Sequence, residues 1–189
     1  MSVVAVVTNS YRSALPTVLV SAFGGLLAGT ILGGMDAELR AVQGLLVMVP
    51  AFLAIRGSVY GSLGSRLSSA LHQGLLDPVF EPDDRLVNAI EAALLNGLTA
   101  SVVAAILTFA ILPAIGHAVA PLWVLVFIAL VGGGLAGLVL TAVIVLVVFV
   151  GYRRGMNPDD LVGPAMTTAG DIFGMASLYI ATKLVLAVL

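Results

Sequence analysis

The sequence predicts an all-α, polytopic integral membrane protein with five transmembrane helices, of which the second is long and broken. Of its 189 residues, 60% are hydrophobic and only 10% are charged, and the mean hydropathy is +1.16. A soluble chain of this length needs far more charge to cover its surface. In addition, five apolar segments are each long enough to cross a bilayer, which takes about 20 residues for roughly 30 Å of hydrocarbon.

These segments define a single transmembrane domain over residues 1–189, with no cytosolic sensor domain expected. The spans lie at about 13–34, 38–76, 84–112, 119–150 and 159–189. Between them stand "GGMDAE", "DPVFEPDDR", "PAIGHAVAP" and "GYRRGMNPDD", whose glycines, prolines and acidic residues are typical of turns.

Composition also limits the kinds of partner and metal site that we expect. The formal net charge of -2 and the scattered basic residues give no reason to expect nucleic acid as a partner, so the lipid bilayer is the expected environment. The absence of cysteine excludes disulfides and thiolate metal sites. No basic residue precedes the short apolar run at the N-terminus, so we expect the first helix, rather than a cleaved signal peptide, to target the protein.

Basic residues near the helix ends predict the orientation, because they favour the cytoplasmic side. The expected cytoplasmic side carries Arg12, Arg85, Arg153 and Arg154, against Arg40 and Lys183 on the other side. With five spans, this places the N-terminus in the cytoplasm and the C-terminus outside a cell membrane.

The first and fourth spans carry small residues at intervals of four, a spacing that lets helices approach closely in lipid. These residues are Gly25, Gly29 and Gly33 in the first span, and Gly133, Gly137 and Thr141 in the fourth. We interpret both stripes as helix packing and assign them no chemistry.

The second span is too polar after Pro50 to face lipid along its whole length, because it continues as "AIRGSVYGSLGSRLSSALHQG". About 39 residues would form a helix of roughly 58 Å, so we expect a kink at Pro50 or Gly57, or a cytoplasmic extension. Arg66 alone is also compatible with a side chain that reaches the cytoplasmic surface. The predicted pore-lining or packing residues are Gly57, Ser58, Gly61, Ser62, Ser65 and Arg66.

The third span places Asn88 and Glu91 on one helix face near its start. Two interpretations of Glu91 stay open at this point. The carboxylate either contributes to a cation path or lies at the headgroup level, where it could pair with an arginine such as Arg66.

The fifth span contains Asp171 near its middle, where a buried carboxylate costs a few kcal/mol even on lenient insertion scales. Thr167 and Thr168 stand one turn before it and Gly174 one turn after it. Three roles remain open for Asp171, namely an ion pair with an arginine of the second span, a proton-carrying carboxyl and a cation site.

Hard oxygen donors such as carboxylates, hydroxyls and amides favour magnesium, calcium or manganese over zinc or copper. Magnesium keeps much of its water shell, so one or two carboxylates in a wet pore are enough to hold it. The candidate metal-binding residues are Asp171, Thr167, Thr168, Glu91 and Asn88. We expect magnesium as a transported ion, with no cofactor and no catalytic residue.

Two stretches resemble the membrane domain of MgtE-type magnesium transporters, especially archaeal half-proteins and the animal solute-carrier magnesium transporters. They are "VPAFLAIRGSVYGSLGSRLSSALHQG" in the second span and "NPDDLVGPAMTTAGDIFG" in the fifth. The resemblance extends in outline over the whole chain, with five spans and the N-terminus inside. The chain departs from the family pattern at Gly163 and at Ser58, where the family commonly has a polar residue and an asparagine, respectively.

The resemblance implies a magnesium transporter or channel whose pore forms at a dimer interface, with Asp171 as the principal ion-binding residue. A glutamate early in the third span also recurs in the family, in agreement with Glu91. The implied assembly is a homodimer, or a heterodimer with a related half-protein.

Two other functions remain open from the sequence. A proton-coupled carrier of another solute would use Asp171 as its protonation site. An intramembrane aspartyl protease is disfavoured, because "TAGD" lacks the first glycine of the "GxGD" pattern and no second aspartate lies within a span.

Overall fold

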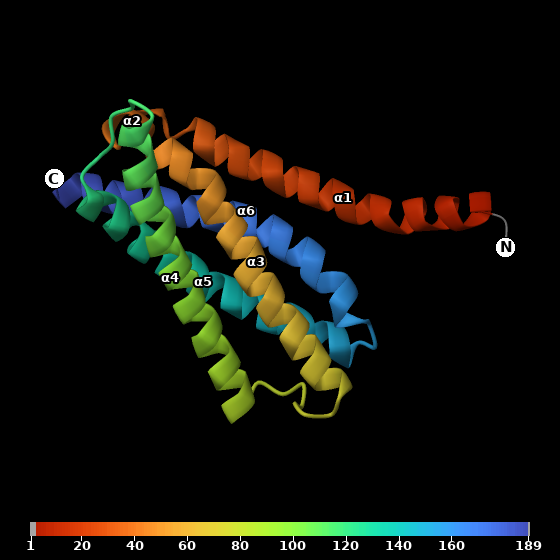
Figure 1. The fold of residues 1–189 in the computed structure, drawn as a ribbon. Coiled ribbons are helices and arrows are strands. Elements are labelled where there is room, and N and C mark those ends of the chain that lie inside the picture. Colours follow the sequence, from red (N-terminus) through yellow and green to blue (C-terminus); the bar gives the residue numbers. More distant parts are fainter. Residues whose placement is uncertain (1–2, 189) are drawn as a thin grey trace.

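The computed structural model describes residues 3–188, which form six helices and no strand. They are α1 (Val3–Gly33), α2 (Asp36–Ala41), α3 (Leu45–His72), α4 (Asp84–Ala114), α5 (Leu122–Arg153) and α6 (Pro158–Val188). Helices α3 to α6 form a bundle, and α1 lies against α6 with its N-terminal part projecting past the other helices (Figure 1). Side chains are described at Tyr11, Leu15, Pro16 and 18–188, so the side chain of Arg12 lies outside the described residues.

Within the described residues, four helices, α3 to α6, are long and apolar enough to cross a membrane. Helix α1 adds a shorter apolar stretch, Val18–Gly33, within the part of the chain that was described. The all-helical fold class is therefore confirmed and four of the spans agree with prediction, whereas the predicted first span at 13–34, and with it the count of five, is not confirmed.

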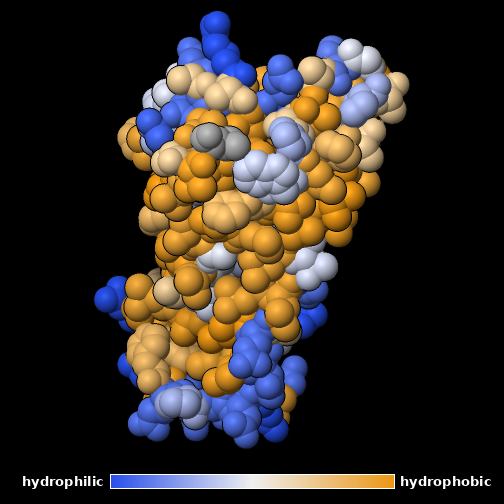
Figure 2. Space-filling model, turned by 90° about the vertical axis from the view of Figure 1, so that its left-hand side faces the viewer, coloured by the Kyte–Doolittle hydropathy of each residue, from blue (hydrophilic) through white to orange (hydrophobic). Residues whose placement is uncertain are grey.

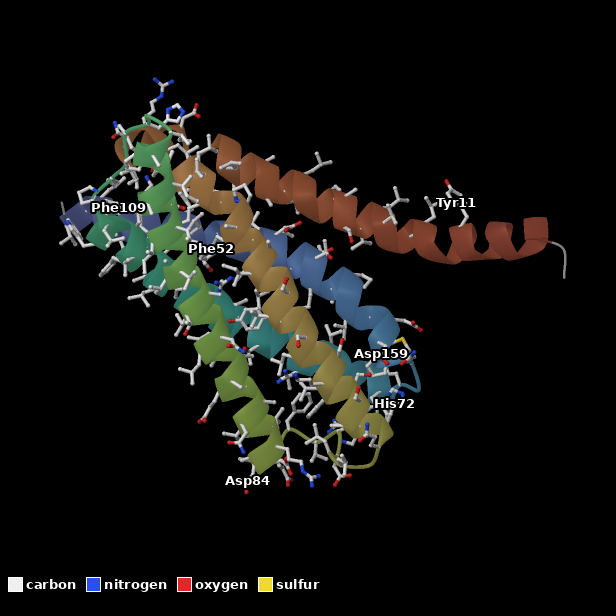
Figure 3. The ribbon with its side chains drawn as sticks, in the orientation of Figure 1. Tyr11, Phe52, His72, Asp84, Phe109 and Asp159 are labelled. Carbon is white, nitrogen blue, oxygen red and sulfur yellow. The ribbon has the colours of Figure 1, made fainter. Side chains whose placement is uncertain are left out.

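The surface agrees with a bilayer environment. Hydrophobic side chains form a continuous band, with hydrophilic side chains gathered above and below it on the visible face (Figure 2). His72, Asp84 and Asp159 lie at the lower end of the bundle, while Phe52 lies inside it (Figure 3). Charged residues thus collect at the ends of the helices, where water and headgroups solvate them.

The predicted second span is broken, but the predicted position of the break is wrong. Helix α3 runs without interruption through Pro50 and Gly57, and the break lies between α2 and α3, where Gly44 has a φ of +99°. Glycine adopts this left-handed conformation readily. Because Pro50 is only one turn from the start of α3, few backbone hydrogen bonds are lost there.

Local signals explain where the helices begin and how they pack. Asp83 caps α4, since its carboxylate accepts hydrogen bonds from the amides of Arg85 and Leu86 at 2.8 and 3.2 Å. Helix α5 contacts α3, α4 and α6 and forms the centre of the bundle. Its fully buried hydrophobic side chains are Leu125, Ile128, Ala129, Ala136, Leu140, Ile144, Val148 and Phe149.

Candidate functional site

The centre of α6 presents a polar strip that contains Asp171. Gly163, Thr167 and Asp171 follow one another at intervals of four residues, so they share one face of the helix. Gly163 and Thr167 are exposed and Asp171 is half-buried. The Thr167 hydroxyl donates to the carbonyl of Gly163 at 3.0 Å, which leaves the lone pairs of the hydroxyl oxygen able to accept hydrogen bonds.

Helix α3 crosses α6 beside Asp171, and glycine makes the close approach possible. A Cβ atom on Gly170 would lie 3.8 Å from Cβ of Arg56 and 4.0 Å from the backbone nitrogen of Gly57. A Cβ atom on Gly174 would lie 2.9 Å from Leu53 and 3.5 Å from Cγ of Arg56. Asp171 therefore lies at the same depth as Arg56 and Gly57.

The Asp171 carboxylate has no hydrogen-bond or ion-pair partner among the residues that the structure describes. In that part of the chain, an ion pair joins Lys183, near the C-terminal end of α6, to Glu38 at 3.1 Å. Neither Arg56 nor Arg66 pairs with Asp171, so the alternative of an ion pair to the second span is not observed.

The two threonines before Asp171 face different neighbours. Thr167 shares the exposed face of Asp171, whereas Thr168 packs on α1, where a Cβ atom on Gly24 would lie 2.6 Å from its methyl group. Thr168 also lines an apolar hollow of about 820 Å³ between α1, α5 and α6. The structure thus brings Thr167 together with Asp171 and turns Thr168 towards α1.

The predicted polar face of α3 lies next to this strip and continues away from it towards α4. Gly57 borders α6 at Gly170, and a Cβ atom on Gly57 or Gly61 would meet no described atom within 4 Å. Ser58, Ser62 and Arg66 line a cavity of about 220 Å³ between α3 and α4, together with Asn96. Apart from the half-buried Gly61, the predicted pore-lining or packing residues are all exposed, Ser65 included.

Glu91 and Asn88 are exposed on α4, which packs on α3 and α5. No hydrogen bond or ion pair links either residue to Asp171 within the described part of the chain. Over the same residues, no group of three His, Cys, Asp or Glu side chains could together hold a metal ion. The structure therefore does not gather the five candidate metal-binding residues into one site.

Arg56 is the polar residue at the centre of the bundle that the sequence analysis did not single out. It is fully buried, with 0% of its surface exposed. Its Nη1 donates to the carbonyl of Gly133 at 3.0 Å and its Nη2 to the carbonyl of Gly97 at 3.1 Å and to the Ser101 hydroxyl. The guanidinium also lies 4.4 Å from the centre of the Phe52 ring, a cation–π distance.

One sequence signal could have found this residue. Arg56 is flanked by aromatic residues at i−4 and i+4, Phe52 and Tyr60, on the apolar rather than the serine-bearing face of the helix. An arginine on the apolar face of a spanning helix must find its partners inside the protein.

Comparisons with known proteins support a transport function. The sequence profile of the MgtE family, described as a divalent cation transporter, matches residues 49–181. Solute carrier family 41 member 2 of Homo sapiens is 28% identical over 171 residues, covering 85% of this chain and 29% of the relative. Solute carrier family 41 member 3 of Rattus norvegicus is 24% identical over 178 residues, covering 92% and 38%. The chain thus spans about a third of the length of these relatives.

Proposed function

Because this chain belongs to the MgtE family of divalent cation transporters, we propose that it carries magnesium across the cell membrane, with Asp171 as the ion site. The ion passes along a pore between two copies of the chain, or between this chain and a related half-protein. As a member of a transporter family the protein is not an enzyme, so the protease alternative is discarded.

The main support for this proposal is the environment of Asp171. The residue lies midway along an apolar helix, is half-buried, and has no cationic partner among the described residues. A carboxylate in this position is costly unless water or a cation compensates its charge. The exposed strip of Gly163 and Thr167 beside it supplies a path by which water and ions reach the carboxylate.

The open face of α3 and α6 favours a dimeric pore. Gly57, Gly61 and Gly163 all border open space, since a Cβ atom on any of them would meet no described atom within 4 Å. Such small-residue surfaces are typical of helix contacts in membranes. Pairing two copies through this face would place two Asp171 carboxylates around one axis.

Hydrated magnesium suits such a pore, because Mg²⁺ keeps several water ligands and binds through one or two carboxylates. The Asp171 carboxylates hold the ion electrostatically, while the Thr167 hydroxyls accept hydrogen bonds from its water shell. The membrane potential drives entry, since a divalent cation gains roughly 4.6 kcal/mol per 100 mV.

Helix ends indicate the orientation of the transporter. At one end of the bundle, loops join α3 to α4 and α5 to α6. This end carries Arg85, Arg153 and Arg154, and we assign it to the cytoplasm. The opposite end, with Arg40 and Lys183, faces outward. Magnesium therefore moves from the α2 end of the bundle towards the acidic loop after α3.

A second candidate is a proton-coupled carrier of another solute, because an isolated carboxyl in a spanning helix also suits proton transfer. The two functions differ in their driving ions. The carrier requires a proton gradient and works without divalent cations, whereas the magnesium pathway requires neither a proton gradient nor a second solute.

The test is magnesium flux into liposomes that contain the purified protein, measured with a fluorescent magnesium indicator under an imposed membrane potential. We expect Asp171→Asn to abolish flux while leaving the fold intact. Asp159→Asn is the matched control, since it changes the same functional group at the exposed start of α6 and should conduct like the unmodified chain.

Equal flux through the unmodified chain and Asp171→Asn would refute Asp171 as the ion site. Flux that follows the proton gradient and persists without divalent cations would instead support the carrier.

A further inference from the structure

The buried guanidinium of Arg56 is unexpected in a cation transporter, because a positive charge in the membrane interior repels cations. It is fully buried near the middle of α3 and has no carboxylate partner within the described part of the chain. Its hydrogen bonds all go to neutral acceptors, namely the Phe52 carbonyl on α3 itself and Gly97, Ser101 and Gly133 on α4 and α5. The charge is held in place without being neutralised.

The geometry relates this charge to Asp171. The side-chain stem of Arg56 lies against Gly170 and Gly174 of α6, the helix that carries Asp171. The guanidinium head extends the other way, between the carbonyls of Gly97 on α4 and Gly133 on α5. The positive charge is therefore fixed behind Asp171, at the same depth, on the side away from the exposed strip.

Few other charges compete with Arg56 at this depth. Helix α1 brings no charged side chain among those described, and α2 contributes Glu38, which pairs with Lys183. The basic residues of α5 lie at its end, at Arg153 and beyond. Because the bundle interior has a low dielectric constant and little screening, a buried charge acts over a longer distance there than in water.

We propose that Arg56 is a positioning residue that tunes the ion site, a fixed positive charge that weakens cation binding at Asp171 so that a bound ion can leave. This inference rests on the proposed function of Asp171. Conduction requires a site that binds an ion well enough to admit it and weakly enough to release it. Without a nearby positive charge, one or two mid-membrane carboxylates would hold a divalent cation too tightly.

The test is the dependence of liposome flux on magnesium concentration for Arg56→Gln, Arg56→Met and Arg56→Lys. Removal of the charge in the glutamine and methionine variants should lower the half-saturating magnesium concentration roughly tenfold and lower the maximal rate, because release slows. The lysine variant keeps the charge and should retain a half-saturating concentration within about twofold of the unmodified value.

Ser101→Ala is the matched control, because it removes one hydrogen bond to the guanidinium without changing any charge. It should leave the half-saturating concentration unchanged. Circular dichroism and thermal unfolding in detergent report the fold of each variant separately from its transport.

Three outcomes would overturn the inference. One is an unchanged half-saturating concentration in the folded neutral variants. Another is an equal effect of Arg56→Lys and Arg56→Gln, which would assign the residue to hydrogen bonding alone. The third is failure of both neutral variants to fold while Arg56→Lys folds, which would assign the charge to helix packing. The proposed function fails separately, if Asp171→Asn in the same assay conducts normally.

Discussion

The two faces of α3 contrast sharply in how tightly the glycines on and around them are packed. On the closed face, which packs on α4, α5 and α6, neighbouring side chains fill the space around each glycine they meet. A Cβ atom on Gly137 of α5 would lie 2.5 Å from the Tyr60 hydroxyl, and one on Gly97 of α4 would lie 2.8 Å from it. One on Gly64 of α3 itself would lie 2.7 Å from Ile144.

On the open face, the glycines have no such neighbours. A Cβ atom on Gly57 or Gly61 would meet no described atom within 4 Å. The serines on this face, Ser58, Ser62 and Ser65, are exposed, and none of their hydroxyls takes part in a hydrogen bond within the described residues.

The contrast shows that the same residue type serves two purposes on one helix. Glycines on the closed face allow helices to approach and are required by the folded monomer. Glycines on the open face leave room that the monomer does not fill, next to the strip that carries Asp171. Substitutions on the closed face should therefore reduce stability, and substitutions on the open face should reduce transport.

The largest effect that we predict is on the open face. Gly61→Leu should reduce magnesium flux at least about tenfold, because the leucine side chain would fill the open space one helical turn from Gly57, on the face that we assign to the pore and the partner chain. Flux into liposomes and the thermal unfolding midpoint in detergent should be measured on the same preparation, and the midpoint should change little.

The matched control is Gly64→Ala, three residues along the same helix. A methyl group there would approach Ile144 at 2.7 Å and Val162 at 2.8 Å, so it should lower the unfolding midpoint. If Gly61→Leu conducted normally, the open face would have no role in the pore.

A smaller effect is expected on the closed face, where Gly137→Ala should destabilise the protein by about 1–3 kcal/mol. The added methyl group would meet the Tyr60 hydroxyl at 2.5 Å and Leu94 at 3.0 Å. Tyr60→Phe removes that hydroxyl, which has no hydrogen-bond partner at standard geometry among the described residues. The double variant should therefore be more stable than Gly137→Ala alone, as measured by chemical unfolding in detergent micelles.

A double-mutant cycle isolates this contact, because it subtracts the separate effects of the two substitutions. Additive effects would contradict the close packing of Tyr60 against Gly137. Strong destabilisation by Tyr60→Phe alone would instead show that the hydroxyl forms a hydrogen bond that the packing requires.

Sequence reasoning predicted the helices of the bundle well, because apolar length is a local property of the chain. Spans expected at 84–112, 119–150 and 159–189 correspond to helices at Asp84–Ala114, Leu122–Arg153 and Pro158–Val188. The break before α3 was misplaced, since the turn at Gly44 packs against Thr108, Leu112 and Val119 from distant parts of the chain. No local pattern near Gly44 records those neighbours.

The candidate site shows the same limit. The depth of Asp171 follows from counting residues along α6, and the shared face of Thr167 follows from helical spacing. The contact of Thr168 with α1 depends on where α1 crosses α6 at Gly24. The burial of Arg56 depends on carbonyls from α4 and α5. Such contacts between helices cannot be derived from the spacing within one helix.

The smallest effect is expected far from both faces, at the ion pair between Glu38 of α2 and Lys183 of α6. Hydrogen bonding with its own backbone, and then with Lys183, lowers the pKa of Glu38 below its ordinary value. A lowered pKa in the folded state means that the stabilisation is fully present above the ordinary glutamate pKa and is lost as the pH falls through the folded-state value. Glu38→Gln should therefore lower the unfolding midpoint at pH 7 by no more than about 2 °C.

The same comparison repeated at acidic pH sharpens this prediction. The difference between the unmodified chain and Glu38→Gln should stay constant from neutral pH to about pH 5 and shrink below it, because protonation of Glu38 removes the charge that the variant lacks. Lys183→Gln should show the same loss at neutral pH, since it deletes the other partner. A difference in unfolding midpoint that grows as the pH falls would contradict the pairing. A large change in magnesium flux in either variant would connect this end of α6 to the open face of the bundle.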